Sequence, residues 1–286
     1  MEPDKVIEAL GKIAEPVNTV VQKISSATGI LYEPVHIRKL AKAEADAKLI
    51  QLETLLGLSR SEAVSIMRRE LIRFENYQGI LDKALPLIGT NSDDSFPSDV
   101  DADWLRLHYE KSSICSDEEM QLLWAKILAG EFSKPNSFSK QALVIVEQLG
   151  KEDAFSFTKF CSCLFEFDGL LAACYFSDQK ALKMLGVSYY SVMQLESFGL
   201  IKLLSSYMDS IGVESSEPKL NYKYFDISGE IELTKTNSKV ETSYSFSFGE
   251  AQLTRPGSEL AKICGASKNL EYLSYIQRKW NDQIVE

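Results

Sequence analysis

Residues 116–131 read Ser-Asp-Glu-Glu-Met-Gln-Leu-Leu-Trp-Ala-Lys-Ile-Leu-Ala-Gly-Glu, and this stretch decides the fold class. Ser116 and Glu119 have the spacing of a capping box, which begins a helix, and Gly130 is typical of a helix end. Between them, apolar residues recur at helical spacing around Trp124. The stretch predicts a buried helix over residues 117–129, with Trp124 in the core, and a mainly α protein.

Upstream of this stretch, residues 1–88 are predicted to form an arm of amphipathic helices. The first helix is expected to kink at Pro16, because proline removes a backbone donor and clashes with the preceding turn. Alanine-rich residues 36–56 predict the second helix, and residues 60–88 predict the third. Long helices joined by short connections are typical of a hairpin or bundle.

The first helix of the arm carries apolar residues at alternating spacings of four and three, which is a heptad stripe. Such a stripe favours a partner helix, so we expect it to bind a protein partner or to mediate self-association. Packing on the chain's own helices is an alternative, and contact with a membrane surface is another. The candidate partner-binding residues are Val6, Leu10, Ile13, Val17, Val20 and Ile24.

The third helix of the arm carries Arg68, Arg69 and Arg73 within about one turn of one another. Clustered arginines are candidates for contact with the phosphates of a lipid or a nucleic acid. Glu70 and Glu75 interrupt the cluster, which favours a solvated helix face instead.

Residues 89–103 are rich in Asn, Ser, Asp and Pro and are predicted to link the arm to a central helical domain, residues 101–170. In addition to the helix at 117–129, we expect helices at 104–111, 139–149 and 151–165.

Residues 177–286 are predicted to form a winged-helix-like α+β domain. Two short helices, the second over residues 189–198, precede strands expected at residues 222–227, 230–236 and 244–253, and a helical segment closes the chain. The helix at 189–198 contains no Lys or Arg, although contacts to bases and phosphates need such residues. We therefore favour a structural role for this helix over DNA binding.

Metal and catalytic motifs are weak in this sequence. Asp99, Asp101 and Asp103 have the spacing of calcium-loop ligands, but Trp104 stands where the loop needs glycine, so we expect helix capping. Cys161-x-Cys163 lies among phenylalanines and is expected in the core. Phosphate-binding loops, dinucleotide-binding turns and nucleophile elbows are absent from the sequence. We therefore expect no metal, no cofactor and no enzymatic activity.

The 286 residues carry a net charge of −10, which disfavours broad nucleic-acid binding and leaves a protein partner as the simpler expectation. The acidic start lacks the pattern of a secretory signal, so we expect a cytoplasmic protein with its five cysteines reduced.

The 116–131 stretch, with Lys134-Pro-Asn-Ser-Phe-Ser-Lys140 and the charged helix around residues 42–48, resembles a family of bacterial proteins called domain of unknown function 2806. The helix at 120–129 is also similar to the abortive-infection alpha family, which is associated with phage defence. The resemblance implies an adaptor or recognition subunit of an antiviral system and implies no catalytic residue. A lipid-surface protein and a winged-helix regulator are the alternatives.

Overall fold

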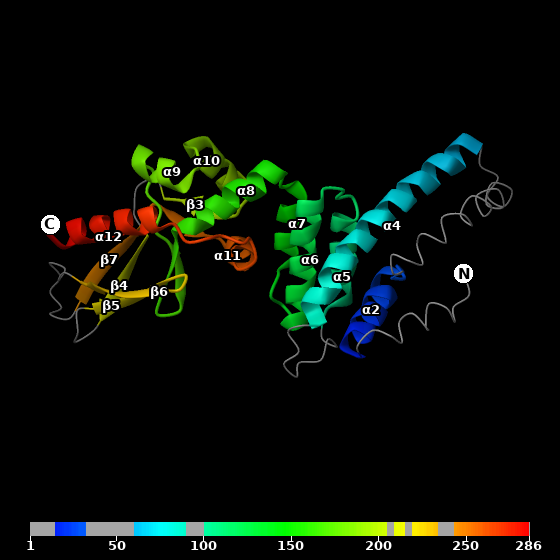
Figure 1. The fold of residues 1–286 in the computed structure, drawn as a ribbon, viewed down its shortest axis with the longest axis horizontal. Coiled ribbons are helices and arrows are strands. Elements are labelled where there is room, and N and C mark those ends of the chain that lie inside the picture. Colours follow the sequence, from blue (N-terminus) through cyan, green and yellow to red (C-terminus); the bar gives the residue numbers. More distant parts are fainter. Residues whose placement is uncertain are drawn as a thin grey trace. The chain divides into compact units, whose positions relative to one another are not determined.

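The computed structural model describes residues 15–32, 60–89, 100–204, 209–214, 219–233 and 243–285. The chain divides into two compact units, Met1–Glu147 (unit 1) and Gln148–Glu286 (unit 2). Helices hold most of the described residues, which confirms the mainly α class (Figure 1). No helix in the described ranges is both long and apolar enough to cross a membrane.

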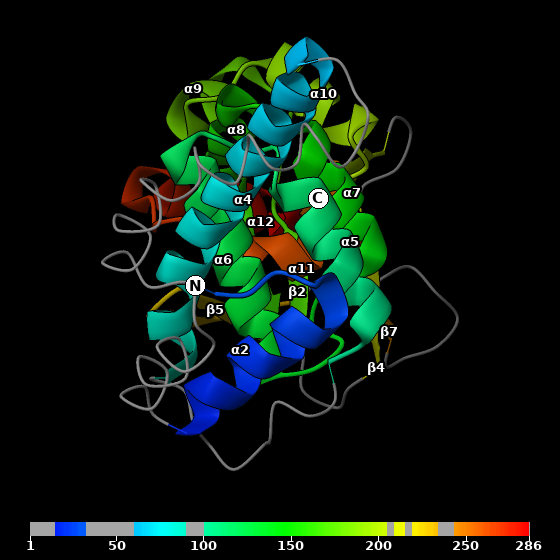
Figure 2. The same ribbon diagram turned by 90° about the vertical axis from the view of Figure 1, so that its right-hand side faces the viewer.

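The described residues of unit 1 form helices and loops, with no strand among them. Figure 2 shows α2 alongside α4 and α5, and contacts join α2 to both. The most extensive helix packing joins α4 to α6, so the expected arm and the first part of the expected central domain share one core. The elements are α2 (Glu15–Thr28), α4 (Arg60–Gly89), α5 (Ala102–Ser112), α6 (Glu118–Ser133) and α7 (Lys140–Gln148).

Aspartates cap two of these helices. The Asp101 carboxylate accepts a hydrogen bond from the Trp104 N–H at 2.7 Å, which confirms capping at the start of α5. The cap of α6 is Asp117, whose carboxylate accepts from the Glu119 and Met120 N–H groups at 3.0 Å. The prediction that Ser116 caps this helix was therefore wrong by one residue.

Gly130 lies inside α6 and does not end it, contrary to the sequence prediction. A Cβ atom at this position would lie 2.7 Å from the ring of Phe138, which is buried against the helix. The glycine therefore serves close packing, because a side chain there would displace the ring.

Unit 2 begins with α8 (Lys151–Phe160), and the helix predicted over residues 151–165 is wrong beyond Phe160. A 3-10 turn, η2 (Cys161–Cys163), leads into a hairpin of β1 (Leu164–Phe167) and β2 (Leu170–Ala173). The expected segment 101–170 is thus divided between the units, since α5, α6 and α7 belong to unit 1 and α8 to unit 2.

The remaining strands of unit 2 are antiparallel. One sheet has four strands in the order β2-β1-β5-β6. Two further sheets have two strands each, β3 with β8 and β4 with β7. The strands are β3 (Ile201–Leu203), β4 (Asp209–Glu214), β5 (Lys219–Tyr224), β6 (Ile227–Glu232), β7 (Ser243–Gly249) and β8 (Ala251–Leu253). The helices around them are α9 (Gln179–Leu185), α10 (Tyr189–Ser197), α11 (Arg255–Ala261) and α12 (Leu270–Val285).

Two predicted strands are interrupted. The strand expected at 222–227 turns at Phe225 and Asp226, which join β5 to β6. The strand expected at 244–253 breaks after Gly249, because the backbone there approaches Tyr175 closely. A Cβ atom on Gly249 would lie 2.3 Å from the Tyr175 carbonyl oxygen, and the Glu250 N–H donates to that oxygen at 2.7 Å.

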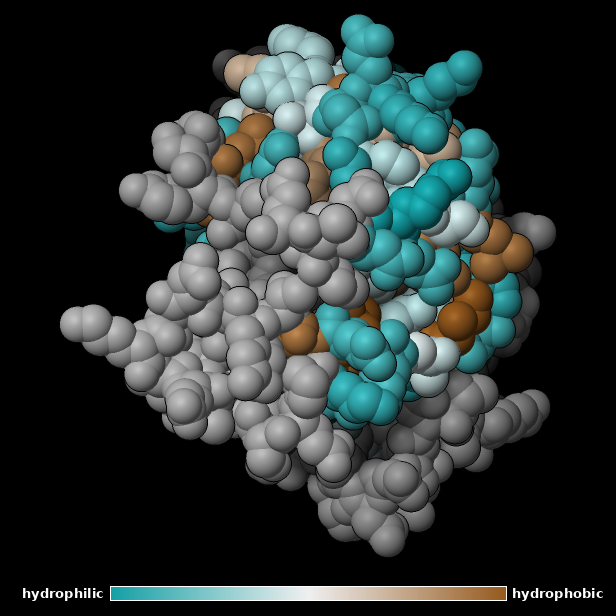
Figure 3. All heavy atoms as spheres, turned by 90° about the vertical axis from the view of Figure 1, so that its left-hand side faces the viewer, coloured by the Kyte–Doolittle hydropathy of each residue, from teal (hydrophilic) through white to brown (hydrophobic). Residues whose placement is uncertain are grey.

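Helix α12 lies beside the strands of unit 2 (Figure 1), and an aromatic cluster joins it to the sheet. The Trp280 ring lies 5.2 Å from the Phe165 ring and 5.1 Å from the Tyr222 ring, measured between centroids. Aromatic pairs at this separation add to the free energy of burial. On the coloured part of the surface in Figure 3, hydrophilic side chains surround small apolar areas.

Candidate functional site

Helix α4 differs in burial between its two halves. From Tyr77 onward its apolar face is buried in the core of unit 1, and Leu81 is 1% exposed. Among residues 65–75, no side chain is buried. The same apolar stripe nevertheless continues there, and Leu71 is 47% exposed. A face that forms the core in one half of the helix is therefore not covered in the other half by the residues that the structure describes.

Four neighbouring side chains lie on or beside this face, and we call them the α4 surface. Half-buried Met67 and exposed Leu71 continue the stripe, and Arg68 and Ile72 are exposed beside it. Met67 and Arg68 lie three or four positions before Leu71, and Arg68 lies four before Ile72, spacings that bring helix side chains together. Ile72 is 56% exposed. The surface therefore combines apolar area with a positive charge.

The three arginines of this region are not equivalent. Arg73 Nη1 lies 3.9 Å from a carboxylate oxygen of Glu70, an exposed pair that contributes little stability. Arg68 and Arg69 are exposed, and neither has an ion-pair partner within the part of the chain that the structure describes. Their charges are therefore available to an acidic group.

The six residues of the N-terminal stripe do not form one described surface. Val20 and Ile24 are buried where α2 packs on α5 and α4. Val17 lies in α2, but its side chain is outside the described residues, as are Val6, Leu10 and Ile13 entirely. The chain itself covers the two side chains whose burial is known.

Helix α10 presents a second exposed face, which the sequence reading missed. Val192 and Leu195 point into unit 2, whereas Tyr189, Tyr190 and Met193 are exposed. The helical spacing of Val192 and Leu195 in the sequence indicates that they share a buried face. No sequence pattern indicates that Tyr189 and Tyr190 are exposed. Glu196 accepts a hydrogen bond from the Leu203 N–H at 2.7 Å and thereby ties α10 to β3.

The titratable groups in the interior do not form a catalytic arrangement within the described ranges. No cluster of His, Cys, Asp or Glu there could hold a metal ion. Burial raises the pKa of the Cys163 thiol, and burial with the neighbouring Cys264 raises that of Cys161, so neither is an activated nucleophile. Both are buried, which confirms the prediction of a core role.

A family model described as protein of unknown function (DUF2806) matches residues 66–277. No curated protein matches the chain, and no solved structure matches it.

Proposed function

This chain belongs to the DUF2806 family of proteins of unknown function, and within it we propose that the chain is a non-enzymatic adaptor that binds a protein partner. One observation carries the proposal. The apolar stripe that faces the core in the second half of α4 continues into residues 65–75, where no side chain is buried. Arg68 and Arg69 lie in the same part of the helix and have no ion-pair partner among the described residues. Monomeric surfaces rarely leave such a stripe uncovered without a binding role.

The occupant that fits the α4 surface is a partner helix with apolar and acidic residues. Leu71 and Ile72 offer aliphatic contacts, and Arg68 and Arg69 complement carboxylates. Residues 65–75, none of which is buried, extend over roughly 16 Å of helix, enough for about three turns of a partner. A partner helix would pack on α4 in the way that α6 packs on it inside unit 1, with apolar side chains of the two helices in contact.

We place this adaptor in bacterial antiviral defence, and the support is the resemblance of the α6 sequence to the abortive-infection alpha family. We also propose that the N-terminal heptad stripe contacts a partner through Val6, Leu10 and Ile13. These three residues lie outside the described residues. Plating of phage on cells that carry the parent chain or the α4 variants below tests this context.

The finer fold of unit 2 that we propose is a winged helix. Its support is the order α8, β2, α9, α10, β3 and β8, with β3 and β8 paired. In such a domain α10 takes the position of the DNA-reading helix. It carries exposed Tyr189, Tyr190 and Met193 and no basic residue, which favours a second protein contact over a DNA regulator.

Replacement of Leu71 and Ile72 together by aspartate is expected to abolish partner binding. Each buried aliphatic side chain contributes about 1.5 to 3 kcal/mol, so loss of both weakens binding by roughly 100-fold or more. Because both side chains are exposed in the free chain, its melting temperature is expected to change little. Affinity purification identifies the partner, and titration calorimetry with that purified partner measures the loss.

Val144→Asp is the matched control, since Val144 is also an exposed aliphatic residue of unit 1 but lies on α7. Equal weakening by both changes would contradict binding through the α4 surface. Anionic vesicles test the lipid alternative. Two results together would replace the adaptor proposal with a lipid-surface role. Vesicle binding would be lost in Arg68→Gln/Arg69→Gln, and no protein partner would be weakened more by the change at Leu71 and Ile72 than by Val144→Asp.

A further inference from the structure

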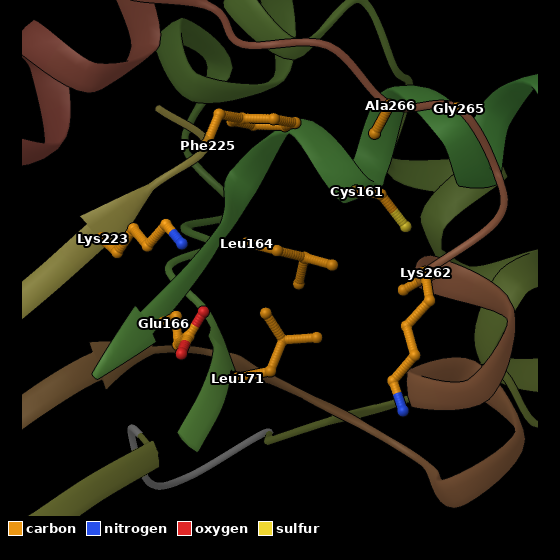
Figure 4. A pocket seen from close by; sticks show the side chains of 10 residues that line it. Cys161, Leu164, Glu166, Leu171, Lys223, Phe225, Lys262, Gly265 and Ala266 are labelled. Atoms are coloured by element: carbon orange, nitrogen blue, oxygen red, sulfur yellow. The ribbon is translucent and has the colours of Figure 1, made fainter. Parts of the chain in front are cut away.

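Unit 2 contains a hollow of about 340 Å³ beside the four-stranded sheet. It lies between β1, β2, the end of β5 and the segment that follows α11 (Figure 4). The volume is at the lower end of the range of small-molecule sites, roughly 300 to 1,000 Å³. A ligand of one ring or one short branched chain is therefore the size that fits.

The inner lining of the hollow is apolar. Figure 4 shows the Leu164 and Leu171 side chains pointing into it, with the Cys161 thiol to their right. Leu164 and Cys161 are buried, and Leu171 is half-buried. Phe225 lines another side from the turn between β5 and β6. This lining favours a ligand with an apolar body.

Three charged side chains border the hollow: Glu166, Lys223 and Lys262. Glu166 and Lys223 are register partners on β1 and β5, so they lie side by side. In Figure 4 Lys262 extends from the opposite side of the hollow. None of the three has an ion-pair partner in the described ranges. Their sum is one positive charge, in a chain whose net charge is −10.

We propose that this hollow binds a small carboxylate with an apolar body, of the arylacetate class. The carboxylate binds Lys262, and the ring lies on Leu164, Leu171 and Phe225. Glu166 lies beside Lys223 and offsets its positive charge, which leaves Lys262 as the cation that attracts the ligand. The site is in unit 2 and does not depend on the α4 surface of unit 1.

Titration calorimetry of the full chain with phenylacetate, phenylacetamide and inorganic phosphate tests the proposal. Phenylacetate is expected to bind at least tenfold more tightly than the neutral amide and to be weakened by added salt. Phosphate is expected not to bind. The variant Lys262→Gln is expected to lose at least tenfold in affinity for phenylacetate.

Lys219→Gln is the control, because Lys219 is a lysine of unit 2 that pairs with Glu230 at 2.7 Å and does not line the hollow. Leu171→Trp is expected to block binding by filling the hollow without changing its charge. Circular dichroism checks that each variant is folded. No binding of phenylacetate to the parent chain, equal binding of the amide, or full affinity in Lys262→Gln would overturn the proposal.

Discussion

Replacement of Trp124 by alanine is expected to lower the free energy of unfolding of unit 1 by about 3 to 5 kcal/mol. Trp124 lies on α6 and is 1% exposed, so its deletion leaves a large cavity in the core. Its ring also packs edge-on against His108, with centroids 5.3 Å apart. Scanning calorimetry, which resolves the unfolding of each unit, measures the effect.

Leu122→Ala is the control for this change, because Leu122 lies on the same helix and is 41% exposed. Its replacement is expected to change the free energy of unfolding by less than about 1 kcal/mol. A melting temperature of Trp124→Ala equal to that of the parent would mean that the aromatic face of α6 contributes nothing to the core.

The sequence predicted the α6 core because its signal is local. Positions such as Trp124, Ile127 and Leu128 repeat with the helical period, and all three are buried. The β1–β2 hairpin also had a local signal, the Asp168-Gly169 pair, and it was missed because the surrounding residues read as one continuous apolar segment. Both residues have positive φ, at 45° and 87°, which suits a two-residue hairpin turn.

The turn after β5 had no comparable signal. Phe225 adopts φ 54°, a conformation that its type rarely takes, so its identity predicts a continuing strand. The turn is held from a distance in sequence, because Lys268 Nζ donates to both Asp226 carboxylate oxygens at 2.8 and 2.7 Å. Phe225 and Lys223 border the hollow, so that candidate site was equally hidden from sequence patterns.

The α4 surface was half predictable. Its stripe and its arginines were evident from the sequence, but the point at which the stripe leaves the core depends on where α6 meets it. The burial of Val20 and Ile24 likewise depends on the packing of α2 against α4 and α5. Helical periodicity identifies an apolar face and does not identify what covers it.

His108 is a buried titratable group in the core of unit 1. Its ring stacks on Trp104 at 5.4 Å between centroids. Its Nε2 lies 3.2 Å from the Trp124 carbonyl oxygen and donates to it in the neutral tautomer that suits this site. Its Nδ1 has no hydrogen-bond partner among the described residues. A proton added at Nδ1 would therefore bring a charge into an aromatic core without an acceptor.

Acidification is consequently expected to destabilise unit 1 through His108. Burial lowers its pKa from 6.5 to about 4 in the folded chain, so the unfolded chain binds the proton more tightly. The contribution of neutral His108 to the free energy of unfolding is fully present above about pH 6.5. It is lost as the pH falls toward about 4, which lowers the free energy of unfolding by about 3 kcal/mol. Denaturant titrations at several pH values measure this loss of free energy of unfolding. The variant His108→Gln is expected to lack the part of the loss that comes from His108, while the other groups still titrate. If parent and variant lose the same free energy of unfolding over this pH range, His108 is not the group responsible.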